Sequence, residues 1–557
     1  MKKRKLRILA VCLALGILLS GCGLEDKIQQ AKEELQQGGL HDALEGLMGG
    51  SGREDVVPFS QMAYSRPDMQ KLETVLQESC RVAETERDID TVLEAVYAYY
   101  DVYDRFFTDL ALADIYYSAD LRDTGWEAEY NFCMENSSAV DAGLEELYRA
   151  LARSPIRDEL ESDQYFGEDY FASYEGESVW DEALVSLLEQ EAQLENRYYT
   201  LTAEAAEAEY YSEAFFTQYG QPMAELFVEL VALRQQIAQE VGYDSYPEFA
   251  YDFYHYRDYT PQQAEGYLEE VRVQLLDIYE RINQSSVWEL SYSYCEEQET
   301  FDYVKTAARN MGGNAAEAFR CMEEGGLYDI TYGQNKMEGA FEVFLWSYYE
   351  PYVFLSPYLD QTDKLTFAHE FGHFVNDYVS FGSYAGTDVA EVHSQGFEYM
   401  SLLYGENTEE LTSYKLADSL CIYMEQAAYA LFEQQVYALE GEALTVEAVY
   451  DLYEQIGRAF GFDSWDWDSR DFVLINHFYT DPMYIISYVV SNDVAFQMYQ
   501  LELEEPGAGL AVYDRCLESQ ESYLVYFAEQ YGLEDPFAPG RLEQVRATLE
   551  KGLSDYL

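Results

Sequence analysis

The sequence predicts a mainly α-helical protein with one small β-sheet. Apolar and aromatic side chains recur at helical spacing over long stretches, namely residues 88–120, 140–151, 179–201 and 223–241. Proline, which interrupts helices, makes up only 12 of the 557 residues. Enrichment in Val, Phe and Tyr, which favours strands, is clearest in residues 336–344 and 350–356. Because 48% of the residues are hydrophobic, the chain can bury a large core.

Residues 1–21 have the composition of a signal peptide. A basic region, residues 2–7, precedes an apolar region, residues 8–19, whose 12 residues are too few for a spanning helix of about 20. The following Leu-Ser-Gly-Cys, which ends at Cys22, resembles a bacterial lipobox. The resemblance implies cleavage before Cys22, diacylglycerol on its sulfur and anchoring by at least two fatty chains, palmitate among them. The alternative is a secreted protein in which this cysteine occurs by chance.

Residues 22–57 are predicted to form a tether, because Glu-, Gln- and Lys-rich helical sequence, with a short helix at 26–37, leads into a Gly-rich break at 48–53. Residues 58–240 are predicted to form an N-terminal helical lobe without chemistry of its own. Its tyrosines are interpreted as core aromatics, and a sugar-binding platform is the alternative. Residues 241–557 contain the candidate catalytic motifs.

The chain is strongly acidic, with a formal net charge of −71 at pH 7. Loss of residues 1–21 would remove five basic and no acidic residues and leave about −76. Such a surface repels nucleic acid and anionic lipid headgroups, so we expect no nucleic-acid partner and attachment to the membrane through lipid alone. The cysteines after residue 22 are widely spaced without a C-x-x-C pair, which argues against a metal cluster and leaves their pairing open.

The strongest chemical motif lies in residues 366–376, which are predicted to form a helix capped by Thr362 or Asp363. His369 and His373 are four residues apart, so both imidazoles leave one helix face and can bind one metal ion. Glu370 lies beside that face, where it can take a proton from water on the metal. This H-E-x-x-H arrangement is typical of zinc metallopeptidases. The alternative is a helix whose histidines only form hydrogen bonds in a core.

A third ligand follows 22 residues after His369. The glycines of residues 382–387 predict a flexible loop, and residues 388–400 predict a second helix that carries Glu391, Gln395 and Glu398 on one side. Glu391 would complete a site of two histidines and one glutamate with a position open for water. Glu398 is predicted to orient a histidine ligand, or else to be a solvated carboxylate. His393 points elsewhere and is interpreted as structural.

These motifs resemble the oligoendopeptidase F and thimet oligopeptidase family of zinc peptidases. The similar features are H-E-F-G-H at 369–373, E-V-x-S at 391–394 and the second glutamate seven residues after Glu391. His393 stands where the family usually has Pro or Ala. The similarity is good over about residues 230–500 and elsewhere extends only to helical character. It implies a two-lobed helical metallopeptidase with a deep substrate channel, a small β-sheet near the zinc helix and one zinc ion per chain.

The same resemblance assigns oxyanion-stabilising donors to residues 476–488, where related peptidases carry a histidine followed by tyrosines. These are His477, Tyr484 and Tyr488, and the two tyrosines are expected to share a helix face at i,i+4. The assignment of the tyrosines stays open, because their spacing from the histidine differs between branches of the family.

The expected activity is hydrolysis of internal bonds in short unstructured peptides, outside the cytoplasmic membrane, by a lipid-anchored zinc endopeptidase. An edge of the small sheet could bind an extended peptide, although a purely structural hairpin is the alternative. Two other functions stay open: a peptide-binding lipoprotein that has lost turnover, and a dipeptidyl carboxypeptidase. Peptide preference and the physiological substrate cannot be read from the sequence.

Overall fold

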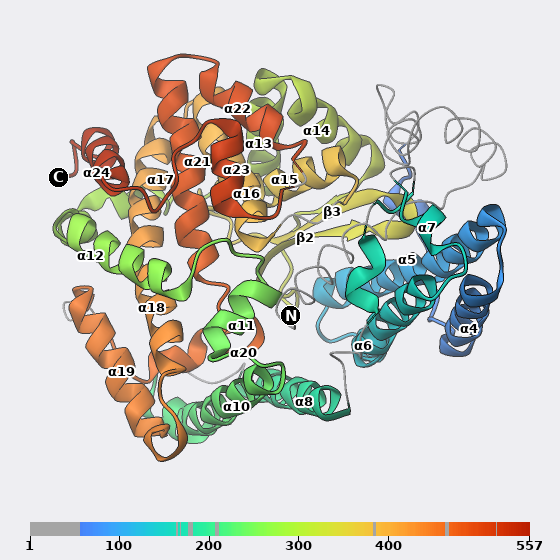
Figure 1. Cartoon of the computed structure of the whole chain (residues 1–557). Coiled ribbons are helices and arrows are strands. Elements are labelled where there is room, and N and C mark those ends of the chain that lie inside the picture. Colours follow the sequence, from blue (N-terminus) through green and yellow to red (C-terminus); the bar gives the residue numbers. More distant parts are fainter. Residues whose placement is uncertain are drawn as a thin grey trace. The chain divides into compact units, whose positions relative to one another are not determined.

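The computed structural model describes residues 56–162, 165–167, 169–175, 182–205, 211–382, 386–462, 467–519 and 521–557. The predicted signal peptide, the lipidation site at Cys22, the predicted helix at 26–37 and almost all of the predicted tether lie outside these residues. Helices dominate the described chain, as predicted, and its strands form one three-stranded sheet (Figure 1). None of the described helices has both the length and the apolar composition that a bilayer span requires.

The chain divides into two compact units. The first comprises the described residues of Lys3–Ser178 and Tyr294–Tyr384, and the second those of Val179–Ser293 and Ala385–Leu557. This division differs from the predicted lobe boundary after residue 240, because residues on both sides of that point belong to the second unit. It also separates residues 294–384, which hold the histidine motif, from the rest of the predicted catalytic region.

The first unit contains several helices and the three-stranded sheet. Its helices and strands are α4 (Met69–Thr85), α5 (Ile89–Ala119), α6 (Thr124–Ala152), α7 (Arg157–Leu160), α13 (Glu297–Met311), α14 (Gly313–Gly325), β1 (Tyr328–Asp329), β2 (Gly339–Leu345), β3 (Glu350–Ser356) and α15 (Asp363–Ser380). Both predicted strand segments are confirmed as β2 and β3, while β1 was not predicted. Helices α5 and α15 both contact β2 (Figure 1).

The sheet has the order β1-β3-β2. Strand β2 pairs antiparallel with β3, from Gly339 opposite Ser356 to Leu345 opposite Glu350, and β1 adds parallel to β3. Strand β3 is buried along most of its length, since it is central and covered by α15. Strand β2 is an edge of this sheet.

The second unit is entirely helical in its described part. Its helices are α8 (Glu182–Ala205), α9 (Glu213–Phe215), α10 (Gln221–Glu240), α11 (Tyr246–Phe253), α12 (Pro261–Asn283), α16 (Thr387–Tyr404), α17 (Glu409–Cys421), α18 (Ala427–Val436), α19 (Val446–Ala459), α20 (His477–Thr480), α21 (Ile486–Glu504), α22 (Ala508–Cys516), α23 (Leu524–Tyr531) and α24 (Arg541–Gly552). Helices α16 and α21 pack against each other along much of their length. Both are almost completely buried, and they bury polar side chains such as Glu391 and Asp493 among the apolar ones.

Within the predicted loop of residues 382–387, the structure describes Gly382, Gly386 and Thr387, and Thr387 already belongs to α16. Helix α15 ends at Ser380, and the next residue, Phe381, has a left-handed backbone with φ 57°. Gly382 follows with φ 74°. Gly386 precedes α16, and a Cβ there would lie 2.1 Å from the carbonyl oxygen of Ser522. The two glycines therefore have different roles: one accommodates a positive φ and the other a close backbone approach.

Candidate metal and peptidase site

Helix α15 presents the two histidines as its period requires. The rings of His369 and His373 are half-buried, and their centroids are 5.0 Å apart. The helix does not begin with the side-chain cap that was expected, because Thr362 makes no capping hydrogen bond. The Asp363 carboxylate instead accepts the backbone N–H groups of Tyr358 and Leu359, which fixes the turn that leads into the helix.

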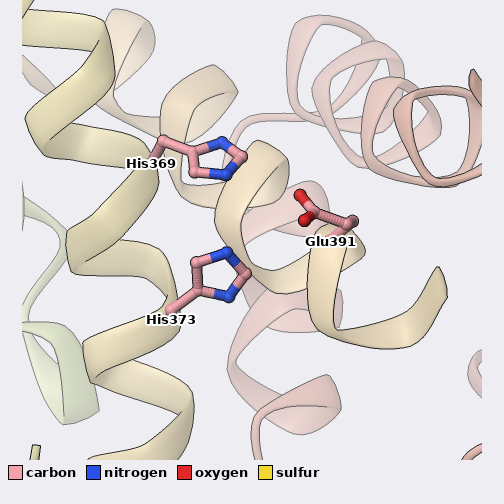
Figure 2. Close-up of side chains that lie close together, drawn as sticks. All are labelled: His369, His373 and Glu391. Atoms are coloured by element: carbon pink, nitrogen blue, oxygen red, sulfur yellow. The ribbon is translucent and has the colours of Figure 1, made fainter. Parts of the chain in front are cut away.

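His369, His373 and Glu391 come together in the structure. Each offers one ligand atom, and these atoms all lie within 4.8 Å of one another (Figure 2). Figure 2 shows the two rings leaving one helix, one turn apart, with the Glu391 carboxylate facing them. Among the described residues, no other three or more His, Cys, Asp and Glu side chains bring their ligand atoms this close together.

The donor set fits zinc. Two imidazole nitrogens and one carboxylate oxygen form a common catalytic zinc set and leave a fourth position for water or substrate. Zinc holds such ligands at about 2.0–2.2 Å. Glu391 is 2% exposed, and a buried carboxylate of this kind needs compensating partners.

The Glu391 carboxylate receives a hydrogen bond on each oxygen. Ser394, one turn later on α16, donates its hydroxyl to Oε2 at 3.1 Å, and Tyr484 donates its hydroxyl to Oε1 at 2.5 Å. Burial, together with the nearby Glu391 carboxylate, raises the pKa of Tyr484 well above its ordinary value. Tyr484 therefore stays protonated and remains a donor at neutral pH. The hydroxyl of Ser394 is a contact that the sequence motif alone did not suggest.

His477, Tyr484 and Tyr488 form an aromatic cluster in the second unit. Their ring centroids are 5.2–5.8 Å apart. The expectation that the tyrosines share a helix face was wrong, because α21 begins only at Ile486 and Tyr484 lies in the turn before it. Met483, with φ 66°, precedes this turn, in which the backbone N–H of Ser487 donates to the carbonyl oxygen of Tyr484 at 2.8 Å.

The ring of His477 is neutral in this environment. Burial lowers its pKa below the ordinary value, although the carboxylates of Asp481 and Glu391 act in the opposite direction. Nδ1 lies 3.0 Å from Oδ1 of Asn476 and Nε2 lies 3.3 Å from the Tyr488 hydroxyl. Both contacts are satisfied when Nδ1 carries the proton and Tyr488 donates to Nε2.

The other glutamate and histidine of α16 are both buried. Glu398 is 5% exposed and forms an ion pair of 2.6 Å with Lys415, which also pairs with Asp418. The alternative of a solvated carboxylate is therefore excluded for Glu398, while its predicted action on a histidine ligand stays a prediction. His393 is completely buried, with its ring 5.8 Å from that of Phe527, and it is not one of the three grouped ligands.

One carboxyl group near the H-E-x-x-H motif was not predicted from the sequence. Glu342 on β2 interacts with two acidic side chains of α15, namely Asp377 and Glu370. Burial, followed by the charges of Asp377 and Glu370, raises the pKa of Glu342 well above its ordinary value, and the side chains of Glu342 and Asp377 are hydrogen-bonded. A glutamate in the middle of an otherwise apolar strand was the available signal.

Comparison with solved structures establishes the fold. A crystal structure assigned to oligoendopeptidase F matches with a TM-score of 0.77 and 22% identity, over 89% of this chain and 99% of the other. Pz peptidase A with an inhibitor gives 0.76 and 21%, over 89% and 99%. A protein of Bacillus anthracis, also assigned to oligoendopeptidase F, gives 0.73 and 18%, over 90% and 99%.

Comparison by sequence is more local. Residues 59–178 match the family model described as the Peptidase M3 N-terminal domain. The sequence motifs predict only helical character for this segment, so the similarity extends well outside residues 230–500. A search of the curated proteins finds no match.

Proposed function

We propose that the protein is a zinc-dependent endopeptidase that hydrolyses internal bonds of short, unstructured peptides. The grouping of His369, His373 and Glu391 carries this proposal. The M3 N-terminal domain at residues 59–178 and the oligoendopeptidase F fold support a metallo-oligopeptidase of this kind.

Zinc held by these three residues would supply two things: a water molecule acidified to a pKa of about 7, and polarisation of the scissile carbonyl. Glu370 follows His369 directly on α15 and is 8% exposed. Its carboxylate would take the proton from the attacking water and then deliver it to the amine of the departing peptide fragment. A carboxylate can do both because it is ionised before the attack and protonated after it.

The oxyanion that forms on the attacked carbonyl needs hydrogen-bond donors. We assign this role to the hydroxyl groups of Tyr484 and Tyr488. The Tyr484 hydroxyl is hydrogen-bonded to the ligand Glu391, and the Tyr488 hydroxyl is hydrogen-bonded to His477. Each hydroxyl has a single proton, so donation to the oxyanion requires Tyr484 to turn its proton away from Glu391 and Tyr488 to turn its proton away from His477. Donation by His477 itself would require the tautomer with the proton on Nε2. Glu398 would support the metal site from α16 by orienting a histidine ligand.

The decisive experiment is metal analysis combined with cleavage of a quenched fluorescent peptide by the purified mature protein. We expect about one zinc ion per chain, loss of activity with a chelator and recovery with zinc. His369→Ala and Glu391→Ala should lose both zinc and activity. Glu406→Ala, an exposed position after α16, is the matched control and should retain both. Full activity of metal-free protein would refute the proposal.

Strand β2 supports an extended peptide as substrate. It is an edge of the sheet order β1-β3-β2, so its outer backbone groups are placed to pair with another strand. A folded substrate would first have to unfold locally to pair in this way. We therefore expect internal cleavage of short peptides and survival of a folded protein that contains the same sequence.

A peptide series of increasing length, digested beside the intact folded protein and read by mass spectrometry, tests this specificity. Products that are only C-terminal dipeptides would instead indicate a dipeptidyl carboxypeptidase. Binding of peptides without any cleavage would indicate a peptide-binding lipoprotein.

We also propose that the protein is attached to the outer face of the cytoplasmic membrane through acyl chains on Cys22. The signal-peptide composition of residues 1–21 and the lipobox-like sequence support this location. Replacement Cys22→Ser should abolish incorporation of labelled fatty acid and leave the precursor uncleaved or the protein shed. Continued labelling of that variant would contradict the lipobox assignment.

A further inference from the structure

The segment that carries His477, Tyr484 and Tyr488 has little regular structure of its own. We call residues 476–488 the His477 segment. Helix α20 is only four residues long, and a turn follows in which Met483 has a positive φ, before α21 begins at Ile486. Such a backbone leaves N–H and C=O groups without helical partners, so they must find partners elsewhere.

Arg234 of α10 holds the first part of the His477 segment. Its side chain is completely buried, and its guanidinium donates to the carbonyl oxygens of Phe478, at 2.8 Å, and Tyr479. The charge is balanced by Glu191 of α8, whose Oε1 is 2.6 Å from Nε, and Oε1 of Glu195 lies 3.3 Å from Nη2. A guanidinium suits this place, because the last carbonyls of a helix are unsatisfied and carry partial negative charge.

Glu433 of α18 holds the middle of the segment. Its carboxyl group is 2% exposed, and Oε1 accepts the backbone N–H of Met483 at 2.9 Å. The preceding carbonyl, that of Pro482, lies 2.9 Å from Nε2 of His255, whose Nδ1 lies 3.2 Å from the hydroxyl of Thr387. The strained turn at Met483 is therefore fixed on both sides by buried side chains.

Arg257 holds the last part and connects it to the helix of Glu391. Its Nη2 donates to the Ser487 hydroxyl at 2.8 Å, and its Nε donates to Oδ1 of Asp388 at 3.2 Å. Ser487 also donates to Asp388, and Tyr259 donates to its other oxygen at 2.8 Å. Asp388 lies in the first turn of α16, three residues before Glu391.

We propose that Arg234, Glu433 and Arg257 are positioning residues that hold the His477 segment in the geometry required for its hydroxyl groups to act. The inference rests on the proposed function. Each side chain is buried and binds a different part of the segment: Arg234 and Glu433 bind backbone groups, and Arg257 binds the hydroxyl of Ser487. Apolar packing cannot replace these contacts, since apolar side chains cannot satisfy buried polar groups. Loss of one of them should lower kcat and leave KM nearly unchanged, because the oxyanion forms only during the reaction.

The test compares matched variants of the full mature protein. Glu433→Met removes the acceptor for the Met483 N–H, whereas Glu433→Gln keeps it. We expect Glu433→Met to lower kcat by about 30-fold to 100-fold with KM changed less than about threefold, as for a misplaced catalytic donor. Glu433→Gln should restore kcat to within about threefold of wild type. Arg458→Met, at an exposed position on α19, is the control for a surface change.

Hydrogen exchange supplies a measurement that does not depend on activity. In Glu433→Met, amides of residues 476–488 should exchange at least about tenfold faster, while those of α15 and the zinc content stay as in wild type. If the segment exchanges faster and kcat is unchanged, or if exchange accelerates throughout the chain together with loss of zinc, the positioning role is refuted. If Glu433→Met does not fold, Arg257→Lys, which keeps the charge but loses the two-pronged contact, replaces it with the same expectations.

If the wild-type protein has no peptidase activity, the proposed function is refuted. Hydrogen exchange then still tests whether the buried side chains hold residues 476–488 in place. Unchanged exchange of residues 476–488 in both variants would then overturn this inference as well.

Discussion

Helix α15 and the His477 segment carry the two halves of the proposed chemistry, and they are built in opposite ways. In α15 the backbone is satisfied by its own 18-residue helix, and His369 and His373 meet because they are one turn apart. In the His477 segment buried side chains from α10 and α18 bind the backbone, and Arg257 binds the hydroxyl of Ser487. A site on a regular helix therefore tolerates substitutions in the residues around it. The geometry of a site on an irregular segment depends instead on side chains that are distant in sequence.

Among the substitutions that distinguish α15 from the His477 segment, the largest effect on kcat is expected at Glu370. Replacement by Gln should lower kcat by about 10³-fold or more, since the base is lost, while zinc content and thermal unfolding stay near wild type because α15 keeps its helix. Metal analysis, circular dichroism and peptide cleavage on one preparation would check this. Wild-type-like turnover in Glu370→Gln would rule out its role as the base.

A smaller effect is expected at the tyrosines. Tyr484→Phe should lower kcat by roughly 10²-fold, the usual loss for one oxyanion donor, and Tyr488→Phe by the same or less. Because Tyr484 also donates to Glu391, only this variant should weaken zinc binding, by about tenfold. Equilibrium zinc competition and steady-state kinetics on both variants distinguish the two positions. Equal zinc affinities would show that the contact with Glu391 does not support the metal.

The smallest effect concerns stability as a function of pH. Burial raises the pKa of Glu433 and of Glu195 to about 8, although Arg234 lowers both and Arg257 also lowers that of Glu433. The folded protein thus keeps protons that an unfolded glutamate loses near pH 4.3. Their contribution to the free energy of unfolding is complete below that pH and is lost as the pH rises through about 8.

Replacement Glu433→Gln removes one of these two titrations. Between pH 5 and 7.5, the free energy of unfolding should therefore fall less steeply than in wild type, by up to about 1.4 kcal/mol per pH unit. Urea unfolding of zinc-free protein at several pH values measures this, and removal of zinc avoids the titration of its ligands. Parallel pH profiles for the two proteins would show that Glu433 does not retain its proton in the folded state.

The sequence predicted several elements well for identifiable reasons. The long helices α5 and α10 follow from uninterrupted helical periodicity, and β2 and β3 follow from runs of Val, Phe and Tyr. The prediction that Tyr484 lies on a helix was wrong. An i,i+4 spacing cannot reveal that Pro482 and Met483 form a turn before α21 begins at Ile486. The sequence motifs also underestimated residues 59–178, whose similarity to the M3 N-terminal domain is carried by a pattern more diffuse than a short motif.

The sequence by itself determined the zinc-ligand candidates. An α-helix has a fixed period, so H-E-x-x-H places two imidazoles on one face wherever the helix lies. Only the tertiary structure decided which side chains hold the His477 segment. Arg234, Glu433 and Arg257 lie 244, 50 and 230 residues from the groups that they bind. No local pattern encodes such partners, because they are brought together by the packing of helices distant in sequence and stay there because buried polar groups must be satisfied.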